Sequence, residues 1–400
     1  MRPLNIPRNV WIVGWVSFFM DVSSEMVYPL VPLFLTTTLH ASISVVGVIE
    51  GIAESTASLL KLFSGALADR FGKNKLLMGI GYGLSTASRP ALALAAGWGT
   101  VLAARFTDRA GKGIRTSPRD AIIAASTPPD RLGLAFGFHR ALDTAGAVVG
   151  PSVALLLLAF WPAEYRLVFW LSIAPALIAI LLIVIFISPD RPRPSLMPSF
   201  SWSLQGFNNG FLRFLLIIGL FSLGNSSNAF LILKAQHVGL TAFWISAVYL
   251  IFNVTYVALS VPAGMIADRV GREVMVLAGF VLFALVYGGL ALAESQWAIG
   301  GLFMLYGVYM GLSDGVQRAY IATLVPEHRK ATGFGMYHMV IGIALLPANL
   351  IAGYLWDHFS SAAPFWFGSA LAVLAAILFV SMIPRRRSHG YERQMPIRSI

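Results

Sequence analysis

Long apolar segments constrain this chain more than any other feature of its sequence. Each is about 20 residues or longer, the length at which an α-helix crosses the hydrocarbon core of a bilayer. They lack the alternation of barrel strands, so we predict an all-α membrane protein with twelve transmembrane helices. The predicted spans are 9–36, 43–67, 74–96, 98–121, 132–159, 165–188, 211–236, 241–266, 273–294, 297–322, 332–356 and 363–384.

The composition is incompatible with an aqueous surface. Of the 400 residues, 57% are hydrophobic and 12% are charged, whereas soluble domains carry about 25% charged residues. The formal net charge of +11 would suggest nucleic-acid binding in a soluble protein. In a membrane protein it has a simpler origin, because Lys and Arg collect in cytoplasmic loops. We therefore expect the lipid bilayer, and no nucleic acid, as a partner.

Several chemistries are excluded or unsupported. The chain has no cysteine, which excludes disulfides, thiol catalysis and thiolate metal sites. It contains neither a G-x-x-x-x-G-K-[ST] loop for ATP nor an H-E-x-x-H zinc motif. We therefore expect no enzyme activity, no cofactor and no metal. Arg2 and Arg8 precede the first apolar run without a small-residue cleavage site, so this run is interpreted as a membrane helix.

The charges between the spans predict the orientation. The turns at one end carry almost no Lys or Arg, with Arg166 as the exception. By the positive-inside rule, the other end faces the cytoplasm, with both termini there, in a bacterial plasma membrane. The basic residues at that end are Arg2, Arg8, Arg70, Lys73, Lys75, Arg131, Arg191, Arg193, Arg269, Arg272, Arg329, Lys330, Arg385, Arg386 and Arg387.

Two sequence blocks recur at nearly the same offset. Residues 65–72 read GALADRFG, and residues 264–271 read GMIADRVG. Likewise, P-x-x-R at 128–131 recurs at 326–329, each followed by Phe-Gly. An internal duplication in a chain of twelve spans predicts two similar six-helix bundles with a substrate site between them at mid-membrane.

A polar stretch rich in Pro, Ser and Arg divides the chain near its midpoint. We predict that it is a cytoplasmic linker, at 189–210, between an N-terminal bundle (1–188) and a C-terminal bundle (211–384). Residues 385–400 then form a basic cytoplasmic tail. We expect a monomer.

The repeated block resembles motif A of the major facilitator superfamily, G-x-L-A-D-R-x-G-[KR]-[KR]. Residues 65–75 match it with Asn74 in place of one basic residue, and residues 264–272 match it up to Glu273. With the spans and the linker, the resemblance covers essentially the whole chain. It implies the fold of this superfamily and transport by alternating access, although a simple basic turn is an alternative explanation of the block. The gating residues that it implies are Gly65, Asp69, Arg70, Gly72, Gly264, Asp268 and Arg269.

Two further segments resemble motifs of the same superfamily. Arg105 resembles the arginine of motif B, which the resemblance links to proton coupling. Gly146, Gly150 and Pro151 resemble motif C, which is associated with exporters that exchange substrate for protons, and we include them among the gating residues. Residues 154–155 replace the small glycine pair that usually follows this proline. A plain helix-packing role for the G-x-x-x-G pattern is equally open.

Asp21 and Glu25 are the candidates for proton coupling within the first span. Their spacing of i, i+4 places both carboxylates on one helical face. Two adjacent carboxylates in a low dielectric do not readily ionise together, so one should hold a proton near neutral pH. The alternative is that both form structural ion pairs with arginines of the fourth span.

Most charges within the predicted spans lie in the first half of the chain. A charge at mid-bilayer costs roughly 3 kcal/mol and needs a partner, a cavity or a function. Positions 105, 108, 109, 112, 115 and 119 of the fourth span form one charged stripe, which must face the protein interior. Glu50 is predicted near the outer end, where solvent would reach it. The candidates for substrate binding or charge compensation are Glu54, Arg109, Lys112, Asp143, Asn225 and Asn228.

These features predict a secondary active transporter of a small organic molecule. The leading interpretation is a proton-coupled exporter, and the excess of cations on the fourth span favours an anionic or amphiphilic substrate. An importer or uniporter of a metabolite or an inorganic ion is the alternative within transport. A receptor or scaffold that does not transport, and an intramembrane enzyme, are the alternatives from other classes.

Overall fold

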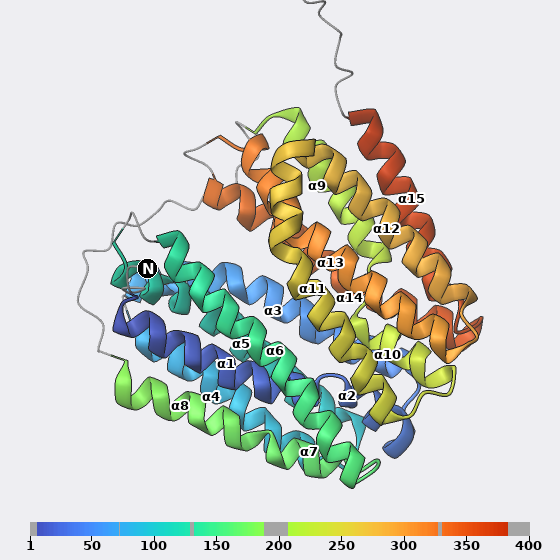
Figure 1. Ribbon diagram of the computed structural model, residues 1–400, viewed down its shortest axis with the longest axis horizontal. Helices are drawn as coiled ribbons and strands as arrows, with labels where there is room; N and C mark the ends of the chain where they lie inside the picture. The colour runs from blue at the N-terminus through green and yellow to red at the C-terminus, as the bar shows by residue number, and fades with distance from the viewer. Residues whose placement is uncertain (1–5, 72, 129–131, 188–206, 327–329, 383–400) are drawn as a thin grey trace, which may run out of the picture.

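The computed structural model describes residues 6–71, 73–128, 132–187, 207–326 and 330–382 (Figure 1). Over these residues the regular secondary structure is entirely helical. Helices and helix pairs coincide with the predicted spans to within a few residues, so the prediction of twelve membrane-crossing rods is confirmed. The elements are α1 (Arg8–Val27), α2 (Leu30–Leu33), η1 (Phe34–Thr38), α3 (Ile43–Phe71), α4 (Asn74–Ala93), α5 (Trp98–Ser126), α6 (Leu132–Phe160), α7 (Tyr165–Leu171), α8 (Ile173–Phe186), α9 (Asn209–Gly224), α10 (Asn228–His237), α11 (Ala242–Val270), α12 (Arg272–Leu292), α13 (Gln296–Leu324), α14 (Lys330–His358) and α15 (Ala363–Met382).

The rods form two bundles. Figure 1 shows α1 to α8, coloured blue to green, beside α9 to α15, coloured yellow-green to red. In the first half α1 packs on α6 and α8, and α5 packs between α3 and α4; in the second half α11 packs on α13 and α12 on α15. The halves meet chiefly along α3 with α14 and α6 with α11. Most of the predicted linker and the whole predicted tail lie outside the described residues.

Polarity sets α4 and α5 apart from the other rods. In the described part of the chain, ten rods are long and apolar enough to cross a membrane by composition alone, and α4 and α5 are not among them. α5 buries Arg105, Asp108 and Arg109. A helix with such a face is compatible with a bilayer only where protein covers it, and α3 and α4 provide that cover.

The two halves touch backbone to backbone at the end where the predicted loops lack basic residues, here called the neutral end. A side chain at Gly47 of α3 would collide with the carbonyl oxygen of Asn349 in α14, and a Cβ at Gly353 would lie 2.8 Å from Ser44 Cα. Small residues permit this close approach between membrane helices. We call this contact the α3–α14 seam.

A carboxylate of the second half caps the first helix turn of α3. Asp357, in α14, accepts hydrogen bonds from the backbone N–H groups of Ile43 (3.2 Å) and Ser44 (2.7 Å). Such a carboxylate satisfies donors that have no partner within the helix and complements the positive end of its dipole. Nearby, Thr36 donates to Gln236 across the halves (3.1 Å). The neutral end is therefore closed.

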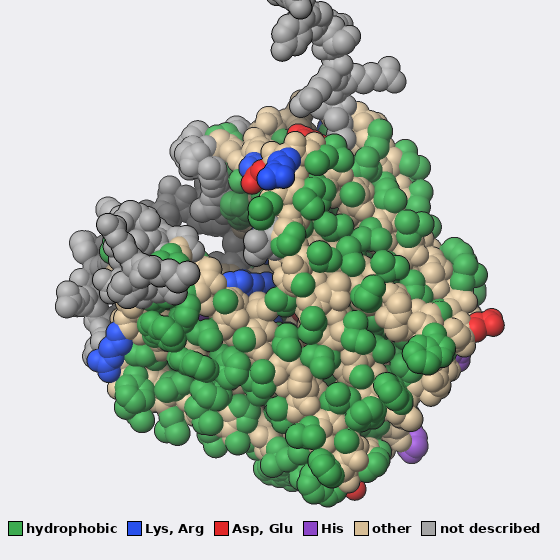
Figure 2. Space-filling model, viewed as in Figure 1, with side chains coloured by type: hydrophobic (Ala, Val, Ile, Leu, Met, Phe, Trp, Pro, Cys, Tyr) green, Lys and Arg blue, Asp and Glu red, His purple; other side chains and the backbone are tan. Residues whose placement is uncertain are grey.

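The opposite end, where the basic loops lie, is hollow. Figure 2 shows an opening between the two halves with Lys or Arg side chains at its floor. Arg140 crosses it, donating to the Tyr256 hydroxyl at 3.1 Å. The molecule is thus closed at the neutral end and open toward the basic end.

We expect Asp357→Ala to favour opening of the neutral end. Loss of a helix cap costs about 1 kcal/mol, a roughly fivefold change in population. Because the chain has no cysteine, a cysteine at Leu346, which packs against Gly51 in the seam, reports the opening through labelling by a membrane-impermeant maleimide added at the neutral side. Glu164→Ala, at an exposed position of the same end, is the control. Equal labelling in both variants would contradict the role of Asp357.

Candidate functional site

A fully buried ion pair lies at the centre of the first half. Arg105 of α5 contacts Glu50 of α3 with Nη2 at 2.7 and 2.9 Å from the two carboxylate oxygens and with Nε at 3.0 Å from Oε1. Glu50 is 1% exposed and Arg105 2%. The prediction that Glu50 is solvated is therefore wrong, because its side chain faces α5 rather than the outer end.

Glu50 also connects the two halves. Its second oxygen accepts a hydrogen bond from Ser227 Oγ at 3.0 Å, and the Ser227 N–H donates to Asn349 Oδ1 at 2.8 Å. The Tyr28 hydroxyl lies 3.3 Å from the same serine oxygen. The charged network of the first half thus ends on a polar group of the second half.

Arg89, which the sequence leaves unexplained, is a member of this network. It is 1% exposed and lies 3.2 Å from Asp108. It also donates to Ser23 (3.1 Å) and Ser24 (2.8 Å) of α1. The signal in the sequence was an isolated cation in the third span, next in chain order to a span with acidic residues. The guanidinium ties α4 to both α1 and α5.

Arg109 and Glu54 form a second pair between α5 and α3, at 2.9 Å. Glu54 is partly exposed, with 26% of its side chain accessible. The Tyr28 ring lies between two guanidinium groups, 5.3 Å from that of Arg105 and 5.4 Å from that of Arg109. Such cation–π contacts help to compensate cations away from water.

Asp21 and Glu25 differ from the paired acids Glu50, Glu54 and Asp108. Among the residues that the structure describes, neither forms an ion pair. Glu25 accepts a hydrogen bond from the Tyr249 hydroxyl of the second half at 3.0 Å, while Lys112 acts electrostatically on both carboxylates. The alternative that both pair structurally with arginines of α5 is therefore not what the described residues show.

The glycines that resemble motif C lie directly behind these two carboxylates. A Cβ at Gly146 of α6 would lie 3.0 Å from Asp21 Cβ, and one at Gly150 would lie 2.8 Å from Glu25 Cβ. The buried Pro151 follows in the same helix. These glycines let α6 contact α1 at the positions that carry the acids, which is a packing role with a direct effect on the site.

Asp143 lies in a polar chain that crosses the hollow. It is 3.4 Å from Arg140 and 3.9 Å from Arg119. Arg140 also lies 3.9 Å from Asp314 of the second half. Asp314 in turn pairs with Arg318, four residues later in the same helix, at 2.6 Å.

The seventh span is broken where the sequence predicts a continuous helix. α9 ends at Gly224 and α10 begins at Asn228, with Asn225 at the break. Ser227 caps α10 by accepting from the N–H of Ala229. Asn228 accepts a hydrogen bond from the Tyr306 hydroxyl at 2.9 Å. The run of Gly, Asn and Ser favours a turn over a helix, and discontinuous helices are typical of transporter binding sites.

The two copies of motif A are described to different extents. Gly72 and the side chains at Gly65, Asp69 and Arg70 lie outside the described residues, so their roles stay predictions. In the second copy, Gly271 ends α11 with φ +107°, a backbone conformation that favours glycine.

The predicted gating residues of the second copy are exposed. Asp268 is 68% exposed and pairs with Arg272 at 3.3 Å, and Arg269 is exposed. A Cβ at Gly264 would meet nothing within 4 Å. In this conformation no helix of the described structure reaches Gly264, and its gating role stays a prediction.

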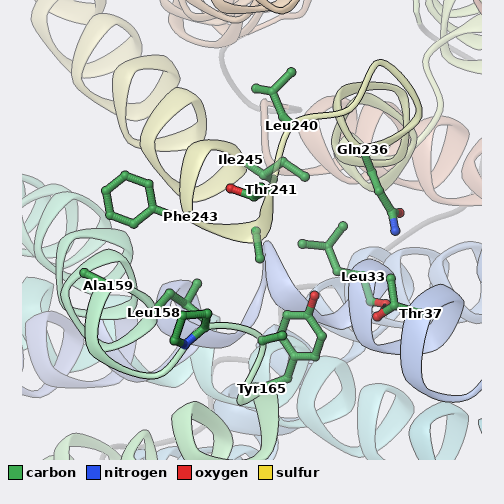
Figure 3. Close-up of a pocket in the computed structure, with 13 residues that line it drawn as sticks. Leu33, Thr37, Leu158, Ala159, Tyr165, Gln236, Leu240, Thr241, Phe243 and Ile245 are labelled. Atoms are coloured by element: carbon green, nitrogen blue, oxygen red, sulfur yellow. Dashed lines mark hydrogen bonds between the residues drawn. The ribbon is translucent and has the colours of Figure 1, made fainter.

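A separate cavity of about 690 Å³ lies at the neutral end (Figure 3). Both halves line it: in Figure 3 Leu33, Thr37 and Gln236 lie on one side, Phe243 on the other and Tyr165 below them. None of the charged residues described above borders it. It is therefore distinct from the candidate site, which is the set of charged and polar groups around the hollow.

Comparison with known proteins identifies the family. The family model described as Major Facilitator Superfamily matches residues 13–203 and 211–394. The chain belongs to the major facilitator superfamily. An uncharacterised MFS-type transporter of Methanocaldococcus jannaschii is 34% identical over 382 residues, covering 94% of this chain and 95% of that protein.

A more distant similarity covers less than half of the chain. The quinolone resistance protein NorA of Staphylococcus aureus is 27% identical over 171 residues, or 40% of this chain and 42% of that protein. Among solved structures, the nucleoside transporter NupG superposes with a TM-score of 0.80 at 12% identity, over 94% of this chain and 100% of that one. The human organic anion transporter TETRAN gives 0.68 at 16% identity, over 95% and 100%. At these identities the structures show the shared fold of this multi-pass membrane transporter family.

We expect Glu50→Gln to lower the melting temperature of the purified protein strongly. Breaking a buried ion pair costs about 3–5 kcal/mol because the remaining charge stays buried and unpaired. Arg318→Gln is the matched control, since its pair with Asp314 is about 40% exposed and such pairs contribute less than about 1 kcal/mol. The double variant Glu50→Gln, Arg105→Gln should show a smaller fall in melting temperature than the sum of the falls in the two single variants. Equal melting temperatures for Glu50→Gln and Arg318→Gln would refute this.

We also expect Gly150→Ala to destabilise the protein by pushing α6 away from Glu25. Gly137→Ala is the control in the same helix, because a Cβ there meets nothing within 4 Å. Alanine favours a helix over glycine by about 1 kcal/mol, so the control should be neutral or stabilising. Thermal unfolding in detergent gives the comparison, and a melting temperature for Gly150→Ala at or above that of the control would count against close α1–α6 packing.

Proposed function

We propose that the chain exports a small organic molecule from the cytoplasm in exchange for protons. The observation that carries this proposal is the state of Asp21 and Glu25, two carboxylates at the interface of the halves without an ion-pair partner among the described residues. Carboxylates in a low-dielectric site that water can reach from one side at a time are suited to carry protons. The similarity to a resistance protein over part of the chain supports export.

The surroundings of these acids fit a change of protonation during transport. Asp21 is influenced by Asp143, Lys112 and Arg115. Glu25 is influenced by Lys112 and by the hydroxyl of Tyr249. Because Tyr249 belongs to the second half, its contact with Glu25 must change when the halves move. Protonation of Glu25 and the position of the halves are therefore coupled in this proposal.

The fixed charges have a different role. Arg105 is held by Glu50, and Glu50 accepts from Ser227 of the other half. We propose that Arg105 transmits the charge state of the acids to this contact between the halves rather than carrying a proton itself. Glu54, Arg109, Lys112 and Asp143, with Asn225 and Asn228 opposite them, then line the path of the substrate.

Gating is proposed at both ends. With the basic end in the cytoplasm of a plasma-membrane protein, the structure corresponds to an inward-open state. Asp357 and the α3–α14 seam close the outside. We propose that the two motif A turns, with Asp69, Arg70, Asp268 and Arg269, hold the cytoplasmic end when the halves rock. The linker at 189–210 would connect the two halves on that side.

The experiment is proton movement in vesicles that contain the reconstituted protein. A pH gradient is imposed, and cationic, anionic, zwitterionic and neutral compounds are added in turn. For a transported compound we expect protons to leave the lumen as the compound enters. Asp21→Asn and Glu25→Gln should each lower this proton flux at least about tenfold, the effect of about 1.4 kcal/mol. Glu164→Gln, at the exposed control position, should leave the flux unchanged.

The outcomes separate the candidate functions. Protons that move in the same direction as the compound would replace exchange by cotransport and favour an importer. Uptake of a labelled compound without any proton movement would leave a uniporter, and Asp21 and Glu25 would then be structural. Flux that persists unchanged in both acid variants would refute their role in coupling.

A further inference from the structure

Two groups of charges around the hollow differ in both burial and pairing. One group is paired and almost fully buried: Glu50, Arg89, Arg105, Asp108 and Arg109. In the described part of the chain, Asp21, Glu25, Lys61 and Lys112 form no ion pair and are partly exposed. Arg115 forms none either, but it is buried, donates to Ser85 and lies over the Tyr82 ring. Paired, buried charges hold helices together, whereas unpaired charges open to a hollow are available to a ligand.

The two lysines lie at a close contact between α3 and α5. Ser117 Oγ donates to the backbone carbonyl of Lys61 at 3.1 Å, and a Cβ at Gly113 would lie 2.6 Å from Leu60 Cβ. Lys112 is next to Gly113 in the chain, and the two ammonium groups act on each other electrostatically.

No acid in the described structure neutralises this lysine pair by direct contact. Glu54 acts on both lysines, but its carboxylate already binds Arg109 at 2.9 Å. Two like charges held together at the edge of a low-dielectric region repel each other. An anion that binds between them would relieve this repulsion.

The acids and the lysines belong to one site. Lys112 acts electrostatically on Asp21 and on Glu25, and α1 packs directly against α5. From the second half, Tyr249 donates a hydrogen bond to Glu25, and His338 of α14 interacts electrostatically with Lys61. The second half therefore faces both the acidic and the basic part of the site.

We propose that the transported molecule is zwitterionic, with a cationic nitrogen bound by Asp21 and Glu25 and a carboxylate or phosphonate bound by Lys61 and Lys112. Two acids and two lysines balance in charge, and a zwitterion leaves that balance unchanged. This inference rests on the proposed function, because exchange requires the cationic nitrogen to replace protons on the two acids. Binding of the zwitterion does not require the buried ion pairs of the first group to break.

The test is binding of matched probes to the purified full chain in detergent, measured by thermal-shift titration. One series consists of phenylalanine (zwitterion), phenylalanine amide (cation), N-acetylphenylalanine (anion) and N-acetylphenylalanine amide (neutral). A second series separates the charges further, with 4-aminomethylbenzoate, 4-methylbenzylamine, 4-methylbenzoate and 4-methylbenzamide. We expect a zwitterion to bind most tightly in at least one series.

Variants of the two charge pairs should change the preference in opposite ways. Lys61→Met and Lys112→Met should each lower the affinity for the zwitterion roughly 10- to 100-fold, the contribution of a hydrogen bond to a charged group. The affinity for the matching cation should stay within about twofold. Asp21→Asn and Glu25→Gln should lower the affinity for the zwitterion and leave the affinity for the matching anion unchanged. Lys73→Met, an exposed lysine between α3 and α4, is the control and should bind all probes like the unchanged chain.

The inference is overturned if a cation, anion or neutral probe leads in both series, if no zwitterion binds at millimolar concentration, or if the variants leave the ranking unchanged. Its failure is distinct from failure of the proposed function. Binding in detergent needs no gradient, so the expected ranking without proton flux in vesicles would refute exchange alone. Proton exchange driven only by singly charged cations would refute the zwitterionic substrate but not proton exchange.

Discussion

The cost of placing charge inside a bilayer determines most of this architecture. α5 carries arginines and carboxylates through the membrane, and each uncompensated charge there would cost several kcal/mol. The fold meets this cost by surrounding α5 with α1, α3 and α4 and by giving Arg105 and Arg89 a carboxylate each. The helices of the first half are therefore placed by electrostatics as much as by apolar packing. The second half has few such charges, and it contributes hydroxyl and amide groups, such as Ser227 and Tyr249, to the same centre.

This asymmetry between the halves gives the site its chemical character. Charges that are fixed by partners cannot readily gain or lose a proton or bind a ligand, because either event would leave the partner unpaired. Only charges that are left without partners remain free to do so. Motif-like glycines bring α6 against α1 behind Asp21 and Glu25, so the free acids stand on a rigid helix pair. A precise position for a reactive group requires such support from its neighbours.

The sequence predicts the twelve rods well because apolar length is a local property of the chain. The Asp314–Arg318 pair is likewise local, because its partners are four residues apart on one helix face. The partners of Glu50 and Arg89 could not be predicted, since they depend on how three helices rotate about their axes, and no local pattern encodes that rotation. Gly264 shows a related limit. The motif identifies the position in the sequence, but whether a helix contacts it depends on the conformation of the two halves. The break at Asn225 was encoded locally, by a run of turn-forming residues, but the apolar residues on both sides masked it.

The two ends of the molecule are held by interactions of different kinds, and this difference suits alternating access. At the neutral end, Gly47 and Gly353 place backbone against backbone, a contact that depends on short-range dispersion and is lost as soon as the helices separate. At the basic end, Arg140 reaches Tyr256 and Asp314 through long side chains that can follow a moving partner. A short-range seam at one end and flexible polar contacts at the other allow one end to open fully while the halves remain connected at the other. The charged centre lies between them, where a small rotation changes the contacts of Glu25 and Glu50 with the second half while the ion pairs within the first half stay intact.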